Sequence, residues 1–356
     1  MIDIKQFGWN SFFEEAFRPY RLQSFLPARV LSEQKHRYQL VSEQGEACAE
    51  VRGKLVYEST GRQDFPAVGD WVVAAVRPEE KSATIHSILP RQTKVSRKVA
   101  GNLTEEQILI ANVDFLFLVN ALDQKVNLRR IERYLSLAWG SGANPAIILT
   151  KADKEAEETI SDILEEMEQI AFGVPVYVIS SLTGYGIDVV QSSLQPGKTV
   201  ALLGSSGAGK STLINYLLGE PLQEIQEVRE GDNKGKHTTT ARELFLLPSG
   251  AILVDTPGMR ELQLWDAQDG VGETFEDIEL FTHQCRFTDC QHQKEPNCAV
   301  KRAIESGELA EERFNNYQKI QRELAYLERK QDVQARLTEK KKWKKVAQHL
   351  KNHKKK

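Results

Sequence analysis

The segment GSSGAGKS, residues 204–211, follows the apolar run TVALL (199–203) and precedes TLINYLL (212–218). A buried strand, a glycine-rich turn and a helix in this order predict a phosphate-binding P-loop. Its glycines let the backbone wrap around phosphates, and the amide hydrogens at the helix start bind negative charge. We expect Lys210 to contact the terminal phosphates and Ser211 to ligate Mg²⁺. The expected contact residues are Gly204, Ser205, Ser206, Gly207, Ala208, Gly209, Lys210, Ser211 and Thr212.

Two later segments should complete a magnesium and γ-phosphate site. In AILVDTPG, residues 251–258, an apolar strand ends in Asp255, which would hold magnesium through water, and Gly258 would offer its N–H to the γ-phosphate. The segment GKHTTT, residues 235–240, lies between the P-loop and this turn, where a mobile loop should bring a threonine to magnesium. We favour Thr239 for this contact. The open alternatives are Thr238 and Thr240.

The choice of base should come from TKAD, which ends the apolar strand PAIIL. Open α/β sheets bind ligands at the carboxyl ends of their strands. The Asp153 carboxylate can accept both the N1 and N2 hydrogens of guanine, a donor pair that adenine lacks, and the Lys151 stem can lie along the base. Thr150 stands where many proteins use Asn, so some loop-fixing hydrogen bonds are lost. The expected base-site residues are Thr150, Lys151, Ala152, Asp153, Ser180 and Ser181.

The chain around these motifs divides into three kinds of pattern. Five short β-like runs lie between Phe25 and Pro90, and their number and spacing predict a small five-stranded barrel. From Gln107, apolar strands alternate with amphipathic helices, which predicts a mainly parallel sheet with helices on both faces. Beyond about Gly270 strand signals disappear and a long charged helical pattern follows. The N-terminal segment reads as a short amphipathic helix.

Three of the four cysteines gather near a histidine in the last third of the chain. The spacing C-x4-C-x-H-x5-C places three thiols and one imidazole within 14 residues, a ligand set that suits tetrahedral Zn²⁺. A complete set without an open position is structural, so the metal should fold this region. His283 competes with His292 as the fourth ligand. The candidate ligands are Cys285, Cys290, His292 and Cys298.

Charge and composition limit the class of protein and its partners. The chain has 356 residues and a net charge of −3, but residues 336–356 carry ten Lys or Arg and one acid. A basic tail on an acidic body indicates a polyanionic partner, although a solvated helix end without a partner is the alternative. No apolar run approaches the roughly 20 residues of a membrane span, and the N-terminus lacks a signal-peptide layout. We expect a cytoplasmic protein without a membrane partner.

The motifs occur in an unusual order: TKAD, Ser-Ser, GSSGAGKS, HTTT and then DTPG. Ordinary GTPases begin with the P-loop. This order, with a barrel before it and a Cys/His cluster after it, resembles the ribosome small-subunit-dependent GTPase family, circularly permuted GTPases of 30S maturation. The resemblance covers nearly the whole chain, and it implies that His292 is the fourth zinc ligand. Thr150 and the extension before Phe25 depart from the family pattern.

The resemblance implies a multidomain α/β protein. Its parts would be an OB-fold-like RNA-binding barrel, a circularly permuted P-loop GTPase domain and a helical zinc-binding module with a basic C-terminal helix. It also implies a GTP hydrolase with Mg²⁺ and one structural Zn²⁺, which binds GTP or GDP, the 30S subunit and its 16S rRNA, and which we expect to be a monomer. The expected boundaries are 1–24 for an N-terminal helical extension, 25–100 for the barrel, 101–268 for the GTPase domain and 269–356 for the zinc module.

Hydrolysis is the step with the fewest candidate residues. Met259 stands where many small GTPases have a water-orienting glutamine, and a thioether cannot orient water, so intrinsic turnover should be slow. His237 could position water once a partner orders its loop, and we assign the catalytic roles to His237 and Lys210. Two other functions stay open: a zinc-dependent RNA-binding adaptor with a regulatory nucleotide site, and a P-loop phosphotransferase that acts on a small molecule.

Overall fold

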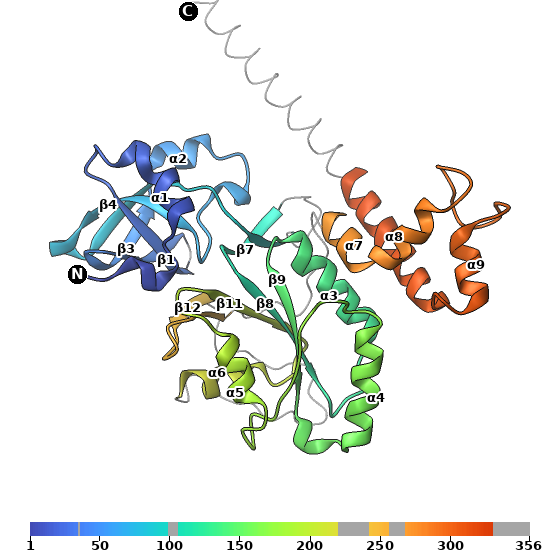
Figure 1. Ribbon diagram of the computed structural model, residues 1–356. Coiled ribbons are helices and arrows are strands. Elements are labelled where there is room, and N and C mark those ends of the chain that lie inside the picture. Colours follow the sequence, from blue (N-terminus) through green and yellow to red (C-terminus); the bar gives the residue numbers. More distant parts are fainter. Residues whose placement is uncertain (35, 99–105, 220–241, 256–267, 330–356) are drawn as a thin grey trace, which may run out of the picture.

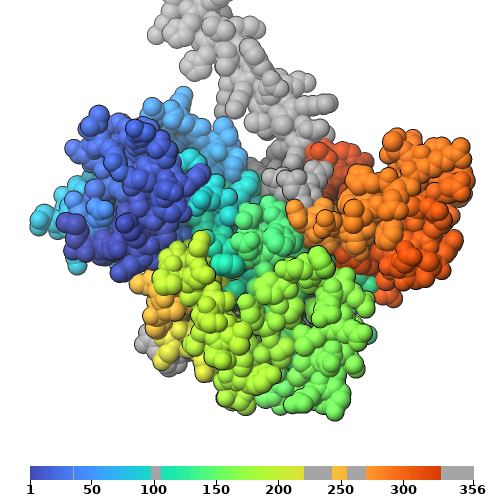
Figure 2. Space-filling view, in the orientation of Figure 1, coloured from blue at the N-terminus to red at the C-terminus, as the bar shows by residue number. Residues whose placement is uncertain are grey.

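The three-dimensional structure is a computed structural model that describes residues 1–34, 36–98, 106–219, 242–255 and 268–329. It has three parts: a barrel near the N-terminus, a central domain built on a sheet, and a group of C-terminal helices (Figure 1). In the space-filling view the barrel and the C-terminal helices form two lobes on opposite sides of the central domain (Figure 2).

The strands are β1 (Leu26–Gln34), β2 (Arg37–Ser42), β3 (Gly45–Val51), β4 (Trp71–Arg77), β5 (Ser82–Ile88), β6 (Lys94–Lys98), β7 (Glu106–Ala111), β8 (Phe115–Ala121), β9 (Asn144–Thr150), β10 (Val176–Val178), β11 (Thr199–Gly204), β12 (Arg242–Leu246) and β13 (Ile252–Asp255). The α-helices are α1 (Ser11–Phe17), α2 (Gly53–Glu58), α3 (Leu128–Gly140), α4 (Glu157–Glu168), α5 (Ile187–Ser193), α6 (Lys210–Leu218), α7 (Gln268–Thr274), α8 (Glu276–His283) and α9 (Ala299–Ser306). A further helix runs from residue 311 to 329. Short 3-10 helices are η1 (Ile4–Phe7), η2 (Arg18–Tyr20), η3 (Arg62–Asp64), η4 (Pro78–Glu80) and η5 (Ala152–Lys154).

Strands β1 to β5 close into the predicted five-stranded barrel. Their order is β1-β2-β3-β5-β4, and β4 pairs back to β1, so no strand of this ring is left as an edge. Alternation along the strands supports the closure: in β3, Ala47 and Ala49 point into the apolar core while their neighbours are exposed. This is the OB-fold arrangement that the sequence predicts. Helix α2 between β3 and β4 was not predicted; none of its residues is fully buried, and Leu55 packs against the barrel core.

The N-terminal extension forms the expected short amphipathic helix and covers one side of the barrel. Asn10 caps α1 by accepting from the N–H groups of the second and third helical residues. Phe13 and Phe17, four positions apart and therefore on one face of the helix, are buried against Trp71 of β4. The Trp9 ring lies 4.7 Å from the Trp71 ring. The extension thus forms an apolar cluster with the outer face of β4, separate from the barrel's interior core.

The central domain has the predicted mainly parallel sheet with helices on both faces. The strand order is β10-β9-β8-β11-β13-β12, and only β12 runs antiparallel to its neighbours. Successive residues of β8 point to opposite faces: Leu116 and Leu118 pack with the residues of α3, whereas Phe117 and Val119 pack with those of α5 and α6. Figure 1 shows α3 and α4 on one face and α5 and α6 on the other.

Barrel and central domain share a sheet and a buried arginine. The edge strand β12 pairs with β1, with Ser32 opposite Glu243, so the two parts form one 11-stranded sheet. Arg29 of β1 is 1% exposed and donates to the hydroxyl of Thr199. Burial lowers the pKa of Arg29 to about 10, and the charges of nearby aspartates offset part of this effect. Its remaining acceptors are the carbonyl oxygens of Phe7, Gly69 and Asn112. The guanidinium therefore joins the extension, the barrel and the central domain.

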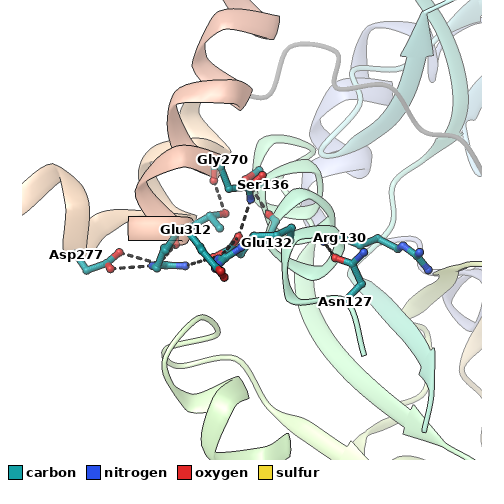
Figure 3. Close-up of polar contacts among 11 residues, drawn as sticks. Asn127, Arg130, Glu132, Ser136, Gly270, Asp277 and Glu312 are labelled. Carbon is teal, nitrogen blue, oxygen red and sulfur yellow. Dashed lines mark hydrogen bonds and ion pairs between the residues drawn. The ribbon is translucent and has the colours of Figure 1, made fainter. Parts of the chain in front are cut away.

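The C-terminal helices dock on α3. Helix α7 crosses α3 at Gly270, where a Cβ atom would lie 2.0 Å from the Ser136 carbonyl oxygen, so only glycine fits. Glu132 of α3 is fully buried and accepts hydrogen bonds from Arg313 at 2.7 Å and from Asn316 at 2.6 Å (Figure 3). Arg313 also pairs with Asp277 of α8 at 2.7 Å. Buried polar contacts thus connect the helix 311–329 to α3 of the central domain, and Arg313 also joins that helix to α8.

Some predictions lie outside the described residues. They include the barrel boundary between residues 100 and 101 and the basic C-terminal helix at 336–356. Among the residues with described structure, no helix combines the length and apolarity that a bilayer span requires.

Candidate nucleotide site and metal centre

Four of the five motif segments meet at one edge of the central sheet. The P-loop follows β11, TKAD ends β9, Ser180 and Ser181 follow β10, and Asp255 ends β13. These strands run parallel, so their carboxyl ends lie at the same edge. The structure describes the backbone of Asp255 there and leaves its side chain undescribed.

The P-loop has the backbone that its glycines predict. Gly207 and Gly209 have φ angles of 74° and 85°, in the left-handed region that favours glycine. At Gly204 a Cβ atom would lie 2.3 Å from the Val119 carbonyl oxygen, so the loop leaves the sheet where no side chain fits. Lys210 begins α6 and its ammonium donates to the carbonyl oxygens of Gly204 and Ser205 at 2.8 and 2.6 Å. Ser211 and Thr212 occupy the first turn of the same helix.

A direct hydrogen bond connects TKAD to the P-loop. The Thr150 hydroxyl donates to the Ala208 carbonyl oxygen at 2.8 Å, and Thr150 is 2% exposed. We expected threonine in place of asparagine to lose some loop-fixing hydrogen bonds, but the Thr150 hydroxyl makes one such bond itself. A Cβ atom on Gly209 would lie 3.1 Å from the same hydroxyl oxygen. The phosphate-binding and base-binding segments, far apart in the chain, are thus in contact.

The Asp153 carboxylate, which we expect to select the base, is held by a serine of the predicted pair. The Ser180 hydroxyl donates to Asp153 Oδ1, and its oxygen also accepts from the N–H of Thr183 at 3.2 Å. The Ser181 hydroxyl is buried and has no hydrogen-bond partner among the described residues. Leu182, which follows, is 82% exposed. These contacts orient Asp153 at the same sheet edge as the P-loop.

Sequence reasoning missed Asp123, which follows β8 between the two motifs. Lys151 donates to Asp123 Oδ2 at 2.7 Å, and Lys154 lies 3.7 Å from the same oxygen. No periodicity or motif marks an acid at this position. By contrast, three predicted nucleotide-site residues lie outside the described part of the chain: His237, Thr239 and Gly258.

The Cys/His cluster forms a compact group of four ligand atoms. The sulfur atoms of Cys285, Cys290 and Cys298 and a ring nitrogen of His292 all lie within 4.8 Å of one another. Among the described residues this group does not include His283. His292 has a φ angle of 59°, a left-handed conformation that turns the loop between the second and fourth ligands.

The distances in this cluster suit a tetrahedral zinc ion. Bonds of about 2.3 Å to sulfur and about 2.0 Å to nitrogen place two ligand sulfurs roughly 3.8 Å apart and a sulfur and a nitrogen roughly 3.5 Å apart. The sulfurs of Cys285 and Cys298 are 3.9 Å apart, and His292 Nδ1 lies 3.6 and 3.4 Å from them. Burial alone would raise the pKa of the Cys285 thiol, but hydrogen bonds from the first backbone N–H groups of α9 and from the other two thiols lower it overall. In contrast, burial and the neighbouring cysteines raise the pKa of the Cys290 thiol to about 11, so the ligand geometry and not the thiol pKa values supports a metal here.

Two family models match the chain. The one described as RsgA GTPase matches residues 88–265, and the one described as 50S ribosome-binding GTPase matches residues 199–355. The first begins ahead of TKAD and ends beyond the DTPG turn, so it contains the base-binding and phosphate-binding segments in their permuted order.

Curated relatives and solved structures agree with the first family. "Small ribosomal subunit biogenesis GTPase RsgA" of Opitutus terrae is 45% identical over 354 residues, 97% of this chain and 96% of that protein. "Small ribosomal subunit biogenesis GTPase RsgA 1" of Oceanobacillus iheyensis is 46% identical over 335 residues, 94% and 95% of the two chains. YjeQ from Thermotoga maritima has a TM-score of 0.63 at 29% identity, over 85% of this chain and 99% of that one. YloQ, described as a circularly permuted GTPase, supports the fold alone, with a TM-score of 0.60 at 24% identity over 87% and 96%. The chain belongs to the RsgA GTPase family.

Proposed function

We propose that this protein is a cytoplasmic GTP hydrolase that acts in the biogenesis of the small ribosomal subunit. The curated relatives that match almost its whole length carry that function in their names. The observation that carries the proposal is the hydrogen bond from Thr150 to Ala208, because it joins the base-selecting segment to the phosphate-binding loop. A single guanine nucleotide can then span both.

Each segment of the site has a distinct role in this proposal. The N–H groups of the P-loop and the start of α6 bind the phosphates, and Lys210 neutralises their charge. Asp153, oriented by Ser180, selects guanine. Of the Ser180 and Ser181 pair, the Ser181 backbone amide would meet the remaining edge of the purine, because the Ser180 N–H donates to the Tyr185 carbonyl oxygen at 2.9 Å. Mg²⁺ with GTP would be held by Ser211 and Thr239, and Gly258 would sense the γ-phosphate. His237 is the proposed water-positioning residue.

The two lobes are the proposed contacts with the subunit. The barrel, residues 25–100, and the zinc module, residues 269–356, would contact 16S rRNA, and the Lys-rich tail would neutralise phosphate in a salt-dependent way. One Zn²⁺ on Cys285, Cys290, His292 and Cys298 would stabilise the module without taking part in hydrolysis. We propose that the protein acts as a monomer on one subunit.

The test is GTP turnover with and without purified small ribosomal subunits. We expect slow intrinsic hydrolysis, stimulation by small subunits, and no comparable effect with ATP or with large subunits. Large subunits are the informative control because one matching family model is described as 50S-binding. Phosphate transfer to a small acceptor would indicate a phosphotransferase instead, and turnover that no subunit changes would contradict the ribosomal proposal.

Two substitutions test the site itself. Lys210→Ala should weaken triphosphate binding or turnover. Asp153→Asn should shift preference from guanosine towards xanthosine nucleotides, because an amide can donate to the xanthine 2-oxo group. Unchanged base preference in the second variant would overturn the assignment of TKAD.

A further inference from the structure

A carboxylate outside the expected motifs lies beside the base-binding lysine. Asp123 follows β8, the strand between β9 with its TKAD segment and β11 with its P-loop. Its Oδ2 accepts from Lys151 Nζ at 2.7 Å, and the two side chains are only 21% and 25% exposed. An ion pair that is three-quarters shielded from water is screened less than a surface pair. The contact therefore fixes the lysine more firmly than an exposed pair would.

The surroundings of Asp123 make Lys151 its main partner. The other carboxylate oxygen, Oδ1, is buried and has no hydrogen-bond partner among the described residues. Lys154 lies 3.7 Å from Oδ2 with a side chain that is 57% exposed, so it adds a longer and more screened interaction. The partly buried carboxylate is thus compensated chiefly by the ammonium of Lys151.

The backbone on both sides of this pair is fixed. The N–H of Leu122 donates to the Thr150 carbonyl oxygen at 2.9 Å, which ties the end of β8 to the start of TKAD. Lys151 itself has a φ angle of 63°, a left-handed conformation that is uncommon outside glycine. The backbone conformation fixes one end of the Lys151 side chain and the ion pair with Asp123 fixes the other, so the stem between them is restricted to one path. Such preorganisation lowers the entropy that a ligand must remove on binding.

We propose that Asp123 is a positioning residue that holds the Lys151 stem as a wall against the guanine base and thereby slows nucleotide release. This inference rests on the proposed nucleotide site. It adds that an acid outside the motifs, Asp123, holds in place the lysine side chain that contacts the base. Asp123 contacts Lys151 and Lys154, and it acts on the nucleotide through Lys151. Because the wall contacts the base equally before and during hydrolysis, it should affect binding and leave the chemical step unchanged.

The experiment measures release of a fluorescent GDP analogue, and KM and kcat for GTP, in Asp123→Ala and its controls. In Asp123→Ala we expect the rate constant of GDP release and the KM for GTP to rise roughly tenfold. This effect is larger than that of losing an exposed ion pair and smaller than that of losing a buried one. The kcat should stay within threefold of the wild type. Lys154→Met is the matched control: it removes the second cation from the same carboxylate and should change release less than threefold. Thermal unfolding of each variant separates loss of the wall from loss of the fold.

A double-mutant cycle with Lys151→Met decides whether Asp123 acts through the lysine. We expect Asp123→Ala to have no further effect on release in the Lys151→Met background. A full tenfold effect in that background, or unchanged release in Asp123→Ala itself, would overturn the inference. An equal effect of Lys154→Met would also overturn it. Asp153→Asn, measured alongside, separates failure of this inference from failure of the proposed nucleotide site. If Asp153→Asn shifts preference towards xanthosine nucleotides while Asp123→Ala has no effect, the nucleotide site stands and only the role of Asp123 is wrong.

Discussion

Replacement of Arg313 by methionine should loosen the C-terminal helices from α3. The Glu132 carboxylate is fully buried, and Arg313 donates to it at 2.7 Å. Burial alone would lower the pKa of Arg313, but its hydrogen bond to Asp277 and the charges of Asp277 and Glu132 raise it, so the guanidinium stays charged. Methionine keeps an apolar stem over the Phe275 ring, above which the guanidinium lies at 4.9 Å, and removes the charge.

The expected cost follows from what remains around Glu132. Breaking a buried ion pair by removing one partner costs about 3–5 kcal/mol. We expect the lower end, about 3 kcal/mol, because Arg129 and Asn316 still donate to the carboxylate. Since each 1.4 kcal/mol is a factor of ten, local opening should become roughly 100-fold more frequent.

Hydrogen exchange of the backbone amides in the helix 311–329 measures this opening directly. Arg133→Met is the matched control, because Arg133 reaches the same helix at Glu323 through a pair whose side chains are 26% and 29% exposed. That pair is shielded about as much as the Asp123–Lys151 pair and should contribute about 1–1.5 kcal/mol, roughly half the effect expected for Arg313. Equal acceleration of exchange in both variants would refute the view that Glu132 is the electrostatic centre of this interface.

Three further predictions concern the other parts of the chain. Phe13→Ala should destabilise the barrel by about 3–5 kcal/mol in thermal unfolding, because that ring is 1% exposed, whereas Phe12→Ala, at 41% exposed, should cost under about 1 kcal/mol; equal costs would contradict the role of the extension. Cys298→Ser should abolish retention of one zinc per chain in elemental analysis, and Cys48→Ser, outside the cluster, should retain it; zinc retained by the first variant would refute the site. Burial alone would raise the pKa of Asp64, but hydrogen bonds from the preceding turn lower it below its usual 3.8. The ionised form of Asp64 therefore stabilises the fold at neutral pH. That stabilisation should be lost as pH falls below about 3.8, and Asp64→Asn should flatten this part of an acid-unfolding curve; an unchanged curve would contradict it.

Motifs at strand ends were the most predictable features of this chain. The P-loop and TKAD each follow a buried strand, and parallel strands bring their carboxyl ends to one edge, so local patterns were enough to predict that the two segments share that edge. The barrel was predictable for a similar reason, because alternation within each short strand fixes its inward face. For both the motifs and the barrel strands, the sequence pattern that allows the prediction lies within a few residues of the structure that it predicts.

Contacts between distant segments could not be predicted. Glu132 reads as one polar position on an amphipathic helix, and its burial depends on Arg313, which is 181 residues away. Asp123 reads as a loop acid, and only the neighbouring strand brings Lys151 to it. The same holds for the pairing of β12 with β1, which depends on where the barrel docks. These features arise from tertiary packing, for which the chain carries no local signal.

The pairing of β12 with β1 has a consequence for the solubility of the isolated central domain. An uncovered edge strand offers unpaired N–H and C=O groups to any other chain and is a common route to aggregation. In this protein the barrel occupies that edge with a strand of its own. Excising the barrel would therefore expose β12 as an unpaired edge strand. The central domain alone should then self-associate through β12 even when its own core is intact.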